Sequence, residues 1–218
     1  YIPTRDDEGY GISKQSIDYA ESIGVKLIIV LDCGIKAVDE IAYAKSKGID
    51  FIICDHHVPD EILPDAVAIL NPKLKDDPYP FKELSGCGVG FKFMQGFAKS
   101  NGITNLYDLE SLLDLLVVSI AADLVPIAGE NRILAYYGLK RLNSNPNVGL
   151  RSIIKPCGLV NKEITISDII FKIGPRINAS GRMQSGQESV ELLVTKDANE
   201  AYEISKTIDQ YNRDRKEL

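Results

Sequence analysis

The sequence has 218 residues, a formal net charge of −6, and 44% hydrophobic and 26% charged residues. This length and composition indicate one sizeable globular domain or two small ones, and the negative charge argues against a broad basic surface for nucleic acid, although a local basic groove is compatible with it. No apolar run approaches the roughly 18 residues of a membrane-spanning helix, and four scattered cysteines without a CxxC pair indicate reduced thiols in a cytoplasmic protein.

The first 80 residues alternate helical patterns with short apolar runs. We predict helices over about 13–22 and 36–47 and strands over 26–31, 50–54 and 66–70. The second helix is expected to end at Gly48 and to bury a stripe made of Val38, Ile41, Ala42 and Lys45. Buried strands that alternate with helices of this length predict an α/β fold with a parallel β-sheet flanked by helices.

The part from 81 to 195 is predicted to be mainly helical. Its helical patterns lie near 87–99, 107–122, 130–142 and 148–155. Another helix is expected to begin at Asp197, an N-cap residue that Glu200 follows three positions later. The chain begins without methionine and ends inside a helical pattern, so we expect a piece of a longer protein. In that protein, 1–195 would form one domain and 196–218 would begin a long helix that links it to the next.

The only two histidines stand side by side after an apolar run, in FIICDHHVPD. Asp55 precedes His56 and His57, and the neighbouring run KLIIVLDCGI ends at Asp32. Ligands of open parallel sheets bind beyond the carboxyl ends of the strands, so these carboxylates and imidazoles are expected to converge on one crevice. Mixed oxygen and nitrogen ligands suit a divalent first-row ion such as Mn²⁺. A pair of solvated loop histidines is the alternative.

Asp123 ends a third apolar stretch, in LLVVSIAADLVPIAGENR. A carboxylate that ends such a stretch must be paired, hydrated or bound to an ion, because burying it alone costs several kcal/mol. Asp123 is therefore either a further ligand of the same centre or the cap of the turn that follows.

Three of these segments resemble the motifs of a known family. VLDCGI, CDHHVPD and AADLVP occur in the order of motifs II, III and IV of the DHH phosphoesterases. FKIGPRINASGRM is similar to a signature of the RecJ-type single-strand-specific DNA exonucleases, and YIPTRDDEGYGIS and LSGCGVGF also resemble that subgroup. The resemblance covers nearly the whole chain, and the GPRINASGR stretch separates this subgroup from the pyrophosphatases and small-oligonucleotide hydrolases of the family.

The resemblance implies a role for each motif residue. Asp32 matches the aspartate that bridges two metal ions, and His56 and Asp123 match further ligands of Mn²⁺ or Mg²⁺. His57 matches the histidine that faces the scissile phosphate and so contacts the substrate. Asp55 is expected to orient the histidine-bearing turn as part of the catalytic group, without binding metal itself.

The GPRINASGR segment (174–182) is expected to contact the substrate. Arg176, Asn178 and Arg182 match the polar side of the family's segment, and such side chains suit nucleic-acid phosphates. The alternative is a structural turn, in which Gly174 and Pro175 break the preceding helix.

The resemblance implies a metal-dependent hydrolase that degrades single-stranded DNA from 5′ to 3′ in DNA repair and recombination. A single-strand-binding protein or a helicase is a candidate partner, and no membrane is involved. The family's motif I and its C-terminal domain have no counterpart in the sequence, so we expect the piece to be inactive alone. A hydrolase of short oligonucleotides or cyclic dinucleotides and a non-catalytic nucleic-acid-binding module remain as alternatives.

Overall fold

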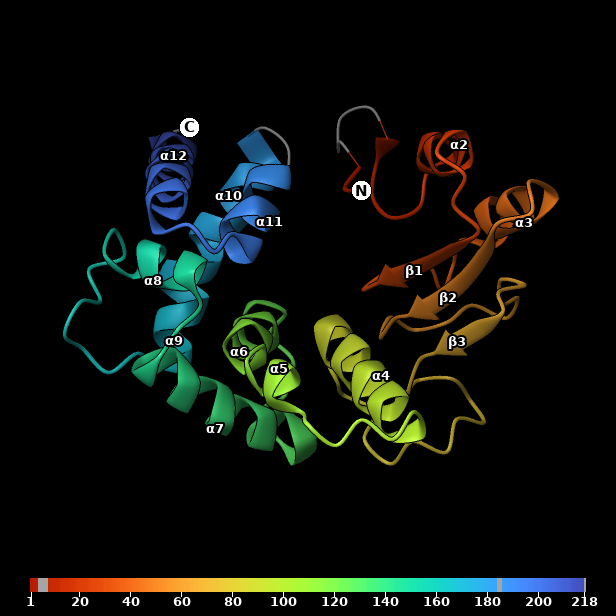
Figure 1. Cartoon of the computed structure of the whole chain (residues 1–218), viewed down its shortest axis with the longest axis horizontal. Coiled ribbons are helices and arrows are strands. Elements are labelled where there is room, and N and C mark those ends of the chain that lie inside the picture. Colours follow the sequence, from red (N-terminus) through yellow and green to blue (C-terminus); the bar gives the residue numbers. More distant parts are fainter. Residues whose placement is uncertain (4–7, 184–185, 218) are drawn as a thin grey trace.

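The computed structural model describes residues 1–3, 8–183 and 186–217, without the side chains of Arg182 and Met183. Figure 1 shows an α/β part and a helical half as the two arms of a U that opens at the top, joined through α4 (Gly86–Ser100) and α6 (Leu113–Ala122). The predicted order, a sheet with helices and then a mainly helical half, is confirmed.

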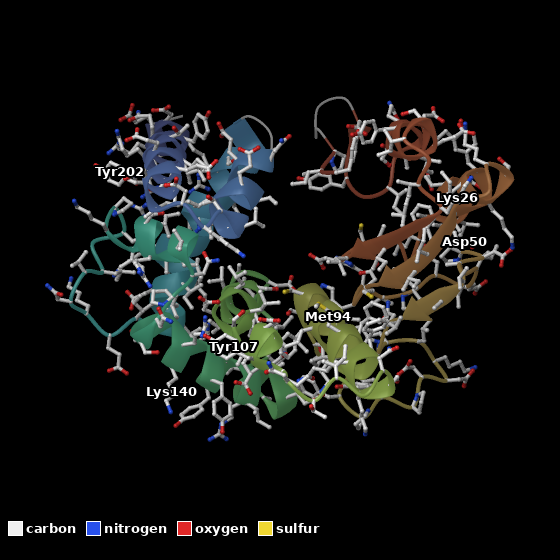
Figure 2. All side chains as sticks on the ribbon, viewed as in Figure 1. Lys26, Asp50, Met94, Tyr107, Lys140 and Tyr202 are labelled. Atoms are coloured by element: carbon white, nitrogen blue, oxygen red, sulfur yellow. The ribbon has the colours of Figure 1, made fainter. Side chains whose placement is uncertain are left out.

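The α/β part is built on a parallel three-stranded sheet. Its strands β1 (Leu27–Leu31), β2 (Asp50–Cys54) and β3 (Ala68–Leu70) lie in the order β1-β2-β3. Helices α2 (Lys14–Ser22) and α3 (Val38–Ser46) pack on one face through a shared apolar core, and α4 packs on the other face. Lys26 and Asp50 mark the amino ends of β1 and β2 in Figure 2, on the side away from the helical half. The carboxyl ends therefore point toward the helical half.

Two predicted helices differ in detail from the structure. In α3, Ile41 and Ala44 are buried, whereas Ala42 and Lys45 are exposed, because residues three apart face the sheet here. The helix predicted over 107–122 is interrupted between α5 (Tyr107–Glu110) and α6. At the interruption, Nε of Arg141 donates to the carbonyl of Ser111 (2.9 Å), an acceptor that a continuous helix would use itself.

The helical half packs around α6. Its other elements are α7 (Gly129–Ser144), α8 (Val148–Ile154), α9 (Ile166–Asp168), the π-helix η1 (Ile169–Ile173), α10 (Gly174–Met183), α11 (Gln187–Val194) and α12 (Ala198–Glu217). Their apolar faces form one core that includes Leu116, Ile153 and Ile208. No helix in the described part of the chain is both long and apolar enough to cross a membrane.

Gly174 and Pro175 do not break the helix, so the turn interpretation of GPRINASGR is wrong. The chain passes from η1 directly into α10, which runs to Met183. A proline inside a regular α-helix clashes with the carbonyl four residues earlier, and the wider π-turn relieves that clash. The amide of Gly174 donates to the carbonyl of Ile169. A Cβ at Gly174 would lie 3.2 Å from that oxygen, so glycine suits the junction.

The last helix begins where the sequence predicts. The side chain of Asp197 accepts from the amides of Asn199 (2.7 Å) and Glu200 (3.2 Å), as an N-cap does. Ala201 and Ile208 are buried where α12 packs on α8 and α10. The domain boundary at 195 and the linker role of 196–218 stay predictions.

Candidate metal centre at the carboxyl end of the sheet

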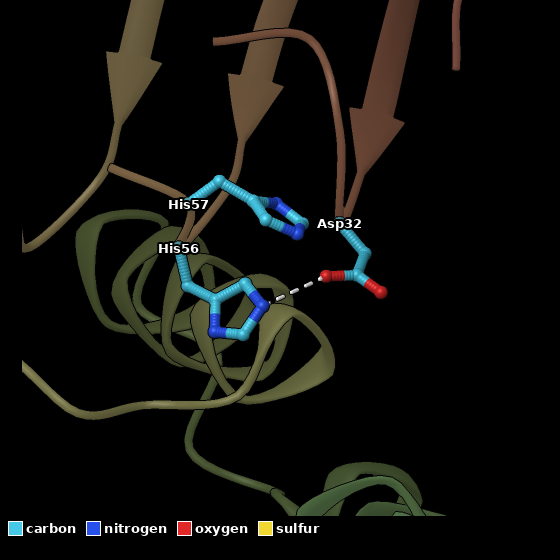
Figure 3. Close-up of side chains that lie close together, drawn as sticks. All are labelled: Asp32, His56 and His57. Carbon is cyan, nitrogen blue, oxygen red and sulfur yellow. Dashed lines mark ion pairs between the residues drawn. The ribbon is translucent and has the colours of Figure 1, made fainter. Parts of the chain in front are cut away.

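Strand register brings the predicted ligands together. Leu31 pairs with Cys54, so the residues that follow β1 and β2 leave the sheet side by side. The amide of Asp32 donates to the carbonyl of Cys54 (2.8 Å), which extends the pairing by one residue. Figure 3 shows Asp32, His56 and His57 beyond the ends of neighbouring strands.

The backbone turns sharply at Asp32. Its φ is +64°, in the left-handed region that non-glycine residues rarely adopt, and Gly34 follows with φ +104°. A residue held there costs of the order of 1–3 kcal/mol, and such strain is concentrated at functional sites. In this conformation the carboxylate of Asp32 reaches the imidazole of His56.

His56 lies at the centre of the cluster. Its Nδ1 is 3.0 Å from the carbonyl of Leu84 and donates to it, which leaves Nε2 for a second partner. Nε2 is 3.2 Å from Oδ1 of Asp32 and 3.3 Å from Oδ2 of Asp123. The carboxylate of Asp32 is the main cause that raises the pKa of His56, burial opposes it, and Asp123 adds to the rise. Nε2 of His56 thus faces two carboxylates, a position in which a cation fits.

Asp123 comes from the helical half. It is the C-terminal cap residue of α6, and Leu124 after it has φ +56°. A hydrogen bond from its side chain to the following turn is not seen among the described residues, whereas its Oδ2 faces Nε2 of His56. The geometry thus favours the ligand interpretation over the capping one.

Asp55 holds the histidine-bearing turn from inside. Its side chain is 1% exposed and accepts from the amides of Ile35 (3.0 Å), His56 (2.7 Å) and His57 (3.2 Å). Nδ1 of His57 lies 2.7 Å from the same carboxylate. Burial alone would raise the pKa of Asp55, but the amide of Ile35 and the imidazole of His57 hold the pKa below its usual value. Asp55 therefore orients His57 and leaves Nε2 of that ring free.

The donor set fits a divalent ion. Asp32, His56 and His57 each offer a ligand atom, and these three atoms lie within 4.8 Å of one another. Asp123 adds a carboxylate beside His56. His56 also has the outer partner, the Leu84 carbonyl, that metal-bound histidines usually have. Two carboxylates with imidazole nitrogens suit Mn²⁺.

Arg176 does not join this site, contrary to prediction. Its Nε donates to Oδ1 of Asp209 (2.8 Å), and its other two nitrogens donate to the carbonyls of Lys172 (2.9 Å) and Pro156 (3.0 Å). Its side chain is 15% exposed. A guanidinium so engaged ties α10 to α12 and has no free face for a phosphate.

The phosphate contacts predicted for the other two residues stay predictions. Asn178 is exposed on α10. Arg182 also lies on α10, but its side chain is outside the described residues.

Two residues near the ligands were not expected from the sequence. Leu84 supplies the carbonyl for His56, and Gly86 lies against Asp32. Both belong to LSGCGVGF, which the sequence singled out only by its resemblance to the RecJ-type subgroup.

Known proteins are similar to this chain in sequence. The model of the DHH family, N-terminal domain, matches residues 1–120. The chain is 42% identical over all its residues to the single-stranded-DNA-specific exonuclease RecJ of Bacillus subtilis and 36% identical to that of Salmonella typhimurium. It spans 27% and 39% of the lengths of these two relatives.

Two solved structures also superpose on this chain. A crystal structure of exonuclease RecJ bound to manganese superposes with a TM-score of 0.87 at 30% identity, over 99% of this chain and 54% of that one. RecJ of Thermus thermophilus in complex with Mn²⁺ gives a TM-score of 0.82 at 28% identity, over 94% of this chain and 30% of the other.

Proposed function

Because the chain belongs to the DHH family, we propose that it is the metal-binding core of a RecJ-type exonuclease that hydrolyses single-stranded DNA from 5′ to 3′. One observation carries the proposal. Nε2 of His56, from the sheet, lies between the carboxylates of Asp32 and Asp123, although Asp123 comes from the other half of the molecule. The proposed setting is DNA repair and recombination in the cytoplasm, with a single-strand-binding protein or a helicase as partner.

The contacts support the roles that we propose for these residues. Asp32, His56 and Asp123 would hold Mn²⁺ or Mg²⁺. A divalent ion supplies Lewis acidity toward a phosphoryl oxygen and activates water at neutral pH. We assign His57 a different role, because Asp55 takes its Nδ1 and leaves Nε2 for another partner beside the cluster. An N–H at Nε2 of His57 can donate a hydrogen bond to a phosphate oxygen of the substrate.

The chain itself is expected to bind one Mn²⁺ weakly and to bind Mg²⁺ more weakly still. The described side chains offer ligands for a single ion, and imidazole suits Mn²⁺ better than Mg²⁺. Isothermal titration calorimetry measures both, with His56→Ala as the variant that should no longer bind. Two tight sites in the parent chain would mean that the ligands are wrongly assigned.

A longer protein that carries this chain is expected to release nucleotides processively from the 5′ end of single-stranded DNA and to leave duplex DNA largely intact. End-labelled strands of several lengths, with cyclic dinucleotides as competitors, measure this preference. Faster turnover of short oligonucleotides or cyclic dinucleotides would favour the small-substrate alternative. DNA binding without turnover in Mn²⁺ would favour a non-catalytic module.

A further inference from the structure

Gly86, the first residue of α4, lies against the carboxylate of Asp32. A Cβ built at Gly86 would lie 2.0 Å from Oδ1, 2.4 Å from Cγ and 2.6 Å from Cβ of Asp32. Any side chain at this position therefore needs the space that the carboxylate occupies. Real Cβ atoms essentially never come within 3.0 Å of another group, so the side chain of Asp32 or the start of α4 would have to move.

The start of α4 is held from several sides. The Oγ of Ser85, the buried N-cap residue, accepts from the amide of Gly88 (3.1 Å). The hydroxyl of Ser119 on α6 donates to that Oγ (3.3 Å). One residue earlier, the carbonyl of Leu84 accepts from Nδ1 of His56. The backbone at 84–86 is thus anchored to α6, whose cap residue is Asp123, and to the imidazole of His56.

We propose that Gly86 is a positioning residue of the metal centre: its missing side chain fixes where the carboxylate of Asp32 lies relative to Nε2 of His56. This inference rests on the proposed metal site. A helix N-terminus carries partial positive charge, so the carboxylate of Asp32 is also favourably placed against the first turn of α4, which has no acidic residue of its own.

Gly86→Ala in the chain as it stands is expected to weaken Mn²⁺ binding by about 10–100-fold, the usual loss when a residue that orients a ligand is changed. Gly96→Ala is the matched control. It lies on the same helix, and a Cβ there meets nothing within 4 Å. In calorimetry, Gly96→Ala should bind Mn²⁺ with the same affinity as the parent chain. A Gly86→Ala chain that binds Mn²⁺ as well as the parent would overturn the proposal.

A double-mutant cycle without metal separates positioning from general packing. Asp32→Gly removes the three atoms nearest to the new Cβ, which are Oδ1, Cγ and Cβ of Asp32. With chelator present, Gly86→Ala should lower the melting temperature of the parent but not that of Asp32→Gly, where alanine favours the helix as it does at Gly96. Equal losses in both backgrounds would overturn the proposal. If the parent fails to bind Mn²⁺, the proposed function fails, and this cycle still decides whether Gly86 positions Asp32.

Discussion

Replacing Asp32 by alanine is expected to abolish nuclease turnover in a longer protein that carries this chain, while the fold stays intact. Its carboxylate lies 3.2 Å from Nε2 of His56 and is a proposed ligand of the ion. The side chain is 59% exposed, so its loss leaves no cavity in the core. Turnover on single-stranded DNA and the Mn²⁺ affinity of the chain should both fall, while circular dichroism stays unchanged.

Asp60→Ala is the control for this experiment. Asp60 is an exposed aspartate three residues beyond His57, and its carboxylate pairs with Lys36 at the surface. Its replacement removes the same charge near the site without removing a proposed ligand, so activity should stay close to that of the parent. Activity of Asp32→Ala within about tenfold of the parent would remove Asp32 from the centre of the mechanism.

Replacing Arg176 by alanine is expected to lower the free energy of unfolding by about 3 kcal/mol, because it leaves Asp209 without its largely buried partner. The change also removes one hydrogen-bond donor from each of the carbonyls of Lys172 and Pro156. Denaturant unfolding of the chain measures the loss. The Mn²⁺ affinity should not change, since none of these contacts involves a proposed ligand.

Arg213→Ala provides the comparison. Arg213 pairs with the other oxygen of Asp209 (3.1 Å) but is 58% exposed, and exposed pairs contribute about 0–1 kcal/mol. A small loss for Arg213 and a large one for Arg176 would support the structural role. If Arg176→Ala left stability unchanged but lowered the salt dependence of single-stranded DNA binding, the predicted phosphate contact would be right after all.

The sheet and most of the proposed centre could be predicted from sequence because their determinants are local. Apolar runs that end in Asp32 and in Asp55-His56-His57 place these residues at one edge of a parallel sheet. Asp123 was suggested by the same reasoning, as a charge at the end of an apolar stretch. Its alternative as a turn cap could be weighed only once the position of α6 was known.

The contacts of Arg176 could not be predicted in this way. Its partner Asp209 lies 33 residues later in α12, and the sequence does not specify which face of that helix meets α10. An arginine in a glycine-bounded segment therefore looked free for a phosphate. The role of Gly86 depends on a distance between two segments, which no local pattern reports.

The left-handed backbone at Asp32 has a consequence for any library of variants selected only for folding. Glycine adopts φ +64° freely, whereas an aspartate held there is strained by about 1 kcal/mol or more. The attraction between this largely exposed carboxylate and His56 offsets only a small part of that strain energy. Such a library should therefore enrich glycine at position 32, and a parallel selection for nuclease activity should restore aspartate. Opposite preferences at this position would show that Asp32 lowers the stability of the fold and is retained for activity.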